Sequence, residues 1–328
     1  MAIFDRHNLQ QQANHRLEAA PNSGKLILLF SGVSAALSLA AGIISMILDS
    51  QIAGTGGLGG MQLRSILSTA QTLLNIFIMA FLPFWSMGYI SVALKLGRGQ
   101  AADEKSLLNG FRRCGPAFRL MLLRQVVNIA IGFAAFQVSS ILFSLTPWAQ
   151  SFYTQLETQT IVDASGMIDE AALASLTASM IPFLIISGVL CLALSIPVTY
   201  RLRMAQYRLM DEPQCGALLA LLQSNRMMKG SCLSLFKLDL HFWWYYLLSV
   251  LVSLLCYGDV LLPMVGITLP FSSDVSFFLF YVLAQGAQIL LYWRCRNLVE
   301  CTYVCAYDAL REEAVSPPQA PQNIPWNN

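Results

Sequence analysis

Six apolar runs, each long enough to cross a bilayer as a helix, constrain this chain more than any other feature. They cover about residues 26–48, 67–94, 120–146, 178–200 and 238–257, and a last stretch that starts near Val275 and continues as helix past the membrane to about Glu313. A helix needs roughly 20 apolar residues to span a hydrocarbon core of about 30 Å. Charged residues make up only 12% of the chain, about half the fraction usual in soluble domains. We therefore predict an all-α fold: a polytopic membrane helical bundle with about six transmembrane helices.

The distribution of positive charge predicts how these helices are oriented. Of the 20 Lys and Arg residues, 19 lie in or at the edges of four segments: the N-terminal tail, the connection between runs two and three, the connection between runs four and five, and the part of the chain that follows the membrane portion of run six. Arg64 is the exception. Positively charged loops stay cytoplasmic during insertion. We predict a multi-pass protein of the cell membrane whose N-terminus and C-terminus are both cytoplasmic.

Three regions follow from this topology. Residues 1–24 are polar and lack the apolar core of a cleavable signal peptide, so they form a cytoplasmic N-terminal segment. Residues 25–313 form the six-span transmembrane domain. Residues 314–328 contain four prolines and no charge, and we expect a disordered cytoplasmic tail. The apolar stretch 260–272 is too short to span, and we interpret it as a loop at the outer interface, with a re-entrant segment as the alternative.

A weak internal repeat relates the two halves of the bundle. Pro83 and Pro197 are separated by 114 residues, and the same offset relates Leu107-Leu108 to Leu221-Leu222 and Arg112 to Arg226. This spacing favours a parallel internal repeat of span, amphipathic segment and span. We expect residues 103–118 and 214–230 to form two cytoplasmic interfacial amphipathic helices, with leucines toward the bilayer and cations toward anionic lipid headgroups.

No motif in the sequence indicates catalysis or a cofactor. HExxH, GxSxG and GxxxxGK[ST] patterns are absent, and the three histidines lie far apart. Cys295, Cys301 and Cys305 lack a CxxC pair or a nearby His, so we expect buried or interfacial thiols rather than a metal site. The deeper polar side chains are amides, which usually bond across helices in a bilayer and alternatively line a solute path.

Residues 196–255 carry a family resemblance. Ile196-Pro197, Tyr207, Asp211-Glu212-Pro213, Met227-Met228 and Gly230 fall in a pattern that is followed by a Leu-Phe-x-Leu-x-Leu element and an aromatic entry to the next span. This pattern resembles the uncharacterised bacterial integral membrane protein family known as domain of unknown function 975. Leu107-Leu108-Asn109-Gly110-Phe111 is similar to another element of that family. The resemblance implies a fold and a location, but no activity.

These observations lead to three functional hypotheses. The first is a non-catalytic membrane scaffold or a subunit of a membrane assembly, with a membrane protein or a second copy of the chain as partner and no nucleic acid. The alternative is a small transporter or channel with a polar path near Asn75, Asn128, Gln285 and Gln288. The third, a membrane-embedded enzyme, requires groups such as Asp239, His241, Glu300 and the Cys301/Cys305 pair to converge. The candidate functional surface comprises Pro197, Arg226, Met227, Met228, Lys229, Gly230, Asp239 and His241.

Overall fold

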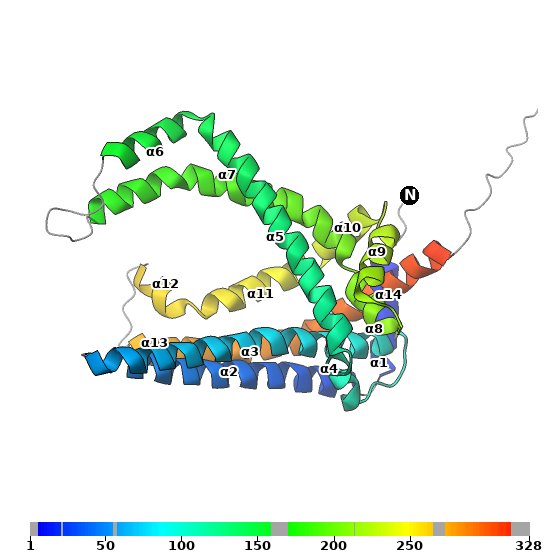
Figure 1. Cartoon of the computed structure of the whole chain (residues 1–328). Helices are drawn as coiled ribbons and strands as arrows, with labels where there is room; N and C mark the ends of the chain where they lie inside the picture. The colour runs from blue at the N-terminus through cyan, green and yellow to red at the C-terminus, as the bar shows by residue number, and fades with distance from the viewer. Residues whose placement is uncertain are drawn as a thin grey trace, which may run out of the picture. The chain divides into compact units, whose positions relative to one another are not determined.

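The computed structural model describes residues 6–20, 22–54, 58–158, 170–212, 214–264 and 273–315, and within these ranges the chain is helical with no β-strand. The elements are α1 (Arg6–Glu18), α2 (Ser23–Gly54), α3 (Leu58–Gly97), the 3₁₀ helix η1 (Glu104–Leu108), α4 (Asn109–Arg112), α5 (Cys114–Ser144), α6 (Pro147–Thr158), α7 (Glu170–Leu202), α8 (Ala205–Asp211), α9 (Ala217–Met227), α10 (Cys232–His241), α11 (Trp243–Leu255), α12 (Gly258–Met264), α13 (Ser273–Leu291), the π-helix η2 (Tyr292–Arg296) and α14 (Asn297–Val315) (Figure 1). Contacts divide the chain into unit 1 (Met1–Phe118 and Met204–Asn328) and unit 2 (Arg119–Arg203).

Within the described residues, five helical segments are long and apolar enough to cross a membrane. They are Ser23–Leu48, Gln62–Gly97, Cys114–Ser144, Thr177–Asp211 and Val275–Glu313. A sixth is counted if α10 and α11, which meet at an angle of 64°, form one span. The helical class predicted from the sequence is thus confirmed, and five or six helices in the described part of the chain have the length and apolar character that a membrane span requires.

The fifth apolar run differs from its prediction as one continuous span. The helix breaks at Phe242, whose backbone leaves the helical region (φ −96°, ψ 19°) and whose side chain is buried. The 13 residues of α11 extend only about 20 Å. Residues 258–264 form α12, so the first part of the predicted loop 260–272 is helical, and residues 265–272 lie outside the described residues.

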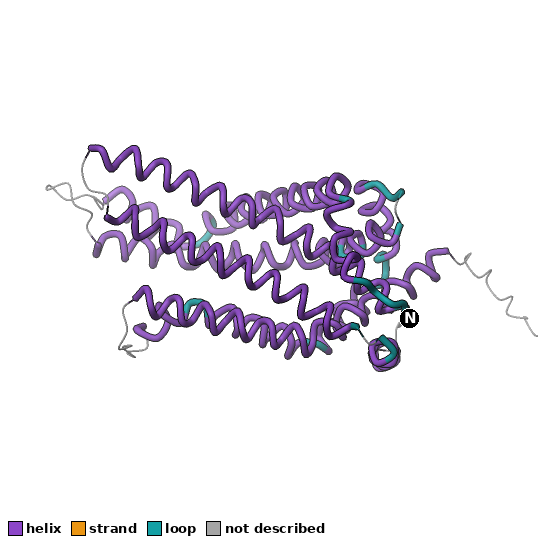
Figure 2. Tube along the Cα trace, turned by 90° about the horizontal axis from the view of Figure 1, so that it is seen from below, coloured by secondary structure: helices purple, strands orange, loops and turns teal. Residues whose placement is uncertain are grey.

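In unit 1, three long helices, α2, α3 and α13, run side by side (Figures 1 and 2). Phe30 of α2 stacks on Tyr89 of α3 with ring centroids 4.5 Å apart, and the Trp85 indole donates to the Phe30 carbonyl at 3.0 Å. Tyr281 of α13 donates to the Ser38 carbonyl of α2 at 3.0 Å. Aromatic side chains therefore set the spacing of the three helices.

The short elements of unit 1 gather where α3 ends and α2 begins. We call this region, formed by α1, η1, α4, α8, α9 and α14, the basic end. The N-terminal segment is helical there, and Arg16 of α1 donates to the Gly97 carbonyl at the end of α3. Asn297 of α14 donates to the Ser23 carbonyl at 2.9 Å and accepts a hydrogen bond from Tyr89. Side-chain bonds to helix termini thus hold the basic end together.

Residues 103–118 of unit 1 do not form one amphipathic helix. They contain η1, the single turn α4 and the start of α5. Leu107 is buried against α3, whereas Leu108 is 48% exposed. Within the second segment predicted to be an amphipathic helix, residues 214–230, residues 217–227 do form a helix, α9.

Unit 2 consists of most of α5 with α6 and α7. Phe183 of α7 makes edge contacts with Phe136 and Phe143 of α5, at centroid distances of 5.6 and 5.5 Å. Phe152 of α6 lies against Phe143. These rings hold the three helices together. Residues 147–158 form the helix α6, although no helix is predicted there from the sequence.

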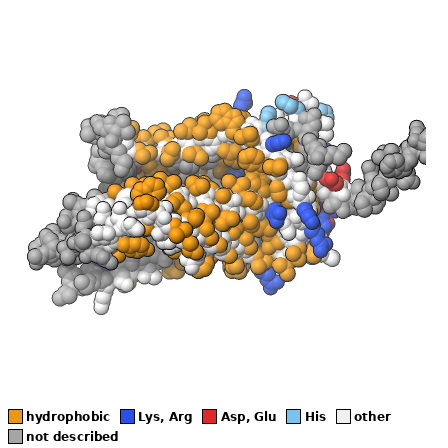
Figure 3. Space-filling model, turned by 90° about the horizontal axis from the view of Figure 1, so that it is seen from above, with side chains coloured by type: hydrophobic (Ala, Val, Ile, Leu, Met, Phe, Trp, Pro, Cys, Tyr) orange, Lys and Arg blue, Asp and Glu red, His pale blue; other side chains and the backbone are white. Residues whose placement is uncertain are grey.

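Hydrophobic side chains cover much of the helical surface shown in Figure 3, and basic side chains gather toward one end of it. Large apolar residues such as Ile47, Ile76 and Met79 are more than half exposed. In water such a surface would be strongly unfavourable, so this pattern agrees with helices that contact lipid.

Candidate functional site

A cavity of about 340 Å³ opens between the three long helices of unit 1. Its lining consists of Phe30, Ser31, Ser34, Ala35 and Ser38 from α2, Leu82 and Ser86 from α3, Gln285, Gln288 and Ile289 from α13, and Tyr292 and Arg296 from η2. The three serines of α2 share one helix face because they are spaced by three and four residues. Polar groups thus line a cavity within segments that are apolar enough to cross a membrane.

The serine hydroxyls of α2 are oriented by their own helix. Ser31 donates to the Ile27 carbonyl at 2.8 Å and Ser34 to the Phe30 carbonyl at 2.9 Å. Their hydrogens are therefore engaged, and their oxygens present lone pairs. By contrast, the Ser86 hydroxyl and the Gln288 amide make no hydrogen bond within the described part of the chain. The cavity consequently offers both acceptors and donors to a bound molecule.

One charged side chain, Arg296, lies in the lining. Its side chain is 15% exposed, and its guanidinium carbon lies 4.7, 5.1 and 4.4 Å from the ring centroids of Phe30, Tyr89 and Tyr292. Aromatic faces stabilise a guanidinium by cation–π interaction and fix its plane. The π-helix η2 contains both Tyr292 and Arg296, and π turns inside α-helices frequently occur at functional sites.

The nearest carboxylate to Arg296 is Glu300. Its Oε1 lies 4.0 Å from Arg296 Nε, which is beyond hydrogen-bond distance. The other oxygen, Oε2, accepts a hydrogen bond from the Tyr207 hydroxyl at 2.7 Å. Glu300 thus balances part of the Arg296 charge without using its donors.

The structure brings together two of the four amides predicted from the sequence to mark a polar path. Gln285 and Gln288 line the cavity. Asn75 is exposed on α3 and does not belong to the lining, and Asn128 is exposed on α5 in unit 2. Sequence reasoning missed Arg296 as a cavity residue, because it follows Trp293 and Arg294 and reads as the charged flank of a span.

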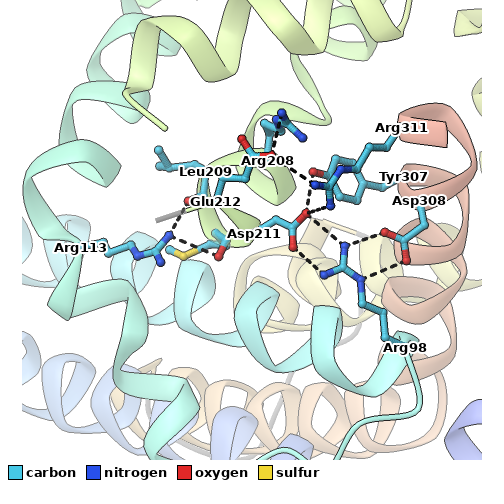
Figure 4. A network of polar contacts seen from close by, with 10 residues as sticks. Arg98, Arg113, Arg208, Leu209, Asp211, Glu212, Tyr307, Asp308 and Arg311 are labelled. Atoms are coloured by element: carbon cyan, nitrogen blue, oxygen red, sulfur yellow. Dashed lines mark hydrogen bonds and ion pairs between the residues drawn. The ribbon is translucent and has the colours of Figure 1, made fainter. Parts of the chain in front are cut away.

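A second polar cluster ties the basic end together (Figure 4). Asp211 of α8 accepts from Arg98 Nη1 at 2.5 Å, from Arg311 Nη1 at 2.8 Å and from the Tyr307 hydroxyl at 3.1 Å. Arg98 also donates to Asp308 at 2.7 Å. The side chain of Asp211 is only 8% exposed, so this carboxylate joins α8 to the end of α3 and to α14 in a partly buried network.

Further contacts extend this network to neighbouring elements. Glu212 pairs with Arg208 at 2.8 Å and with Arg311 at 3.3 Å, and Arg113 donates to the Leu209 carbonyl at 2.7 Å. Hydrogen bonds to Asp211 and then to Asp308 raise the pKa of Arg98 above its ordinary value. Every side chain of the cluster is therefore used within the protein, and we interpret it as structural.

The residues of the candidate surface at the end of α9 differ in exposure. Met228 is buried, Met227 is half-buried, and Arg226 and Lys229 are exposed. Gly230 has a φ of +91°, a conformation that favours glycine because it has no Cβ. Pro197 lies inside α7 of unit 2.

Asp239 and His241 at the end of α10 contact other helices. His241 Nε2 lies 2.8 Å from Gln10 Oε1 of α1, and its ring is 5.6 Å from that of His7. Asp239 accepts from Tyr246 at 3.3 Å. In the described ranges, no group of three or more His, Cys, Asp and Glu side chains could hold a metal ion.

Comparison with known proteins places the chain in a family. A family model described as a protein of unknown function (DUF975) matches residues 1–311. The chain belongs to the DUF975 family. No curated protein and no solved structure matches it.

Two elements through which the sequence resembles the DUF975 pattern have physical roles in this member. The acidic step supplies Asp211 and Glu212 to the network of the basic end. In the element 107–111, Asn109 donates to Ser91 of α3 at 2.9 Å, and Gly110 lies against the α3 backbone. Both elements thus fasten short segments to α3 or to its end.

Proposed function

We propose that this DUF975 member is a non-catalytic, multi-pass protein of the bacterial cell membrane that binds a small polar solute between α2, α3 and α13 and moves it as a small transporter. The observation that carries this proposal is the polar cavity of about 340 Å³ inside the bundle of unit 1. Small-molecule sites usually have volumes of about 300–1,000 Å³ and a few convergent polar groups. Polar side chains in membrane-spanning segments are costly and commonly mark solute paths.

The proposed topology places both termini in the cytoplasm. It rests on the 19 cations that flank one set of span ends and on the positive-inside tendency. The basic end then lies on the cytoplasmic side. In this arrangement Arg296 is closer to the cytoplasmic surface than the α2 serines that follow Ser31.

Cysteine accessibility tests the solute path. Ser34→Cys and Gln288→Cys place thiols in the cavity, and Ile43→Cys places one on an exposed apolar position of α2. Charged, water-soluble thiol reagents should modify the two cavity thiols from either side of the membrane and leave the thiol of the Ile43→Cys variant unmodified, as read for each thiol by peptide mass spectrometry. Reaction from one side only would contradict transport, and no reaction would contradict a hydrated cavity.

A second candidate function, a membrane scaffold or assembly subunit, is favoured by exposed leucines outside the long apolar segments. Leu218, Leu219 and Leu222 of α9 are 62%, 49% and 52% exposed, and Arg226 and Lys229 follow them. Such a surface suits an interface with anionic lipid headgroups or a contact with another membrane protein or second copy. Purification in mild detergent as a monomer without a partner would count against an assembly role.

A further inference from the structure

Arg296 indicates which class of molecule the cavity prefers, whereas the volume of the cavity alone does not. We infer that the cavity binds an oxyanion, a phosphate or carboxylate group, on the Arg296 guanidinium, and that the rest of the bound molecule carries hydroxyl groups. This inference rests on the proposed function, because it names the class of molecule that the cavity takes.

The donor set of Arg296 suits an oxyanion. A guanidinium has five N–H donors in a planar fork that matches the geometry of carboxylate and phosphate. Among the described residues, its contacts are the three aromatic rings and Glu300 at 4.0 Å, and none of them is a hydrogen bond. Rings can hold the guanidinium plane, but they leave its N–H edges available to an oxyanion.

The local charge balance at Arg296 also favours a second anionic group. The closest approach of Glu300 is to Nε, and its Oε2 accepts from Tyr207. The carboxylate therefore stabilises the buried cation from one side, and Tyr207 engages its other oxygen. The terminal nitrogens of Arg296 remain for a second anionic group, which would also satisfy donors that are expensive to leave unpaired in a membrane.

The other polar groups of the lining determine which chemistry suits the remainder of the ligand. Ser86 and Gln288 can donate to further oxygens, whereas Ser31 and Ser34 have their hydrogens engaged and can only accept. A molecule that pairs with both the donors and the acceptors of the lining must carry hydroxyl groups in addition to its oxyanion. Glycerol phosphate has this chemistry, either as a free solute or as the headgroup of phosphatidylglycerol.

Binding to the purified full-length protein in an uncharged detergent tests the inference. One arm titrates sn-glycerol 3-phosphate by calorimetry, with glycerol as the uncharged control. The other arm measures the melting temperature in mixed micelles with phosphatidylglycerol against phosphatidylcholine. Saturable binding in the first arm identifies a free solute, and selective stabilisation in the second identifies a lipid headgroup.

Variants on one helical turn provide the matched control. Arg296→Gln should weaken the binding of whichever ligand is active at least tenfold, since it removes a charge-assisted contact. Arg294→Gln, which makes the same charge change at an exposed position outside the lining, should leave binding unchanged. If Arg296→Gln does not fold, Gln288→Leu should weaken binding severalfold, and the active ligand should slow the modification of Ser34→Cys.

The inference is overturned if the wild-type protein binds neither ligand saturably, or if Arg294→Gln and Arg296→Gln weaken binding equally. Its failure is distinguishable from that of the proposed function. If the cavity thiols react from both sides of the membrane but no oxyanion binds, the protein is a transporter of another solute. If an oxyanion binds but the cavity thiols react from one side only, the cavity is a binding site and the protein does not transport the ligand.

Discussion

Two glycines determine how closely the segment after α3 approaches that helix. A Cβ on Gly88 would lie 1.7 Å from the Leu107 carbonyl oxygen, and one on Gly110 would lie 2.0 Å from the Phe84 carbonyl oxygen. Both obstacles are backbone atoms, which cannot move aside as a flexible side chain can. The contact between α3 and residues 107–110 therefore requires the absence of both side chains.

Substitution of either glycine should separate the two segments. We expect Gly88→Ala and Gly110→Ala each to lower stability by about 2 kcal/mol or more, as overpacking commonly does, measured by thermal unfolding in detergent. Gly32→Ala is the control, since no atom lies within 4 Å of its added Cβ, and it should be neutral or stabilising. Equal behaviour of the three variants would refute the close contact.

At the scale of elements, ion pairs between charged side chains join the ends of the long helices. A buried aromatic side chain, Phe242, lies at the point where one helix breaks. The sequence shows the acidic pair Asp211-Glu212 clearly, but not its partners, since Arg98 and Arg311 are each about 100 residues away. Likewise, the hydropathy of residues 238–257 indicates a span but not its break at Phe242, because an average over a window does not register a local change of backbone direction.

Removal of the Asp211 charge should loosen the basic end. Asp211→Asn leaves Arg98 and Arg311 without their shared carboxylate, and we expect a loss of about 3 kcal/mol, as for other broken buried pairs. The exposed Glu313→Gln is the charge-matched control and should change stability little. Hydrogen exchange can locate the effect, which should appear in α8 and α14. Unchanged protection there would contradict the structural role of the network.

The break between α10 and α11 has an equally direct test. Phe242 is 1% exposed and its neighbour Trp243 is 58% exposed. Phe242→Ala should cost about 3–5 kcal/mol by leaving a cavity, whereas Trp243→Ala should cost much less. The same loss in both variants would show that the break is not anchored by Phe242.

At the scale of the whole molecule, the sequence predicted the features that depend on composition along the chain. The lengths of the apolar runs predict the helical class and the positions of most helices that are long and apolar enough to span. The resemblance in residues 196–255 predicts the family. The sequence indicates only part of the cavity lining. Gln285 and Gln288 were candidates because they are polar in an apolar run, but Ser31, Ser86 and Arg296 meet them only through the packing of α2, α3 and η2.

Thiol labelling of intact cells tests the proposed orientation. Cys114 is exposed and lies at the first residue of α5, at the end of that helix that we place on the cytoplasmic side. A membrane-impermeant maleimide should label it in inside-out vesicles and not in intact cells. Cys215, whose pKa is raised by burial, should stay unmodified in both until the protein is denatured. Labelling of Cys114 in intact cells would reverse the topology.

We infer that the cavity at Arg296 holds an oxyanion. Electron cryo-microscopy of the full-length protein in nanodiscs that contain phosphatidylglycerol, with glycerol phosphate added, tests it most directly. We expect density between α2, α3 and α13 within hydrogen-bond distance of the Arg296 guanidinium and Gln288. A closed contact of these helices, or a cavity whose density does not touch Arg296, would contradict it.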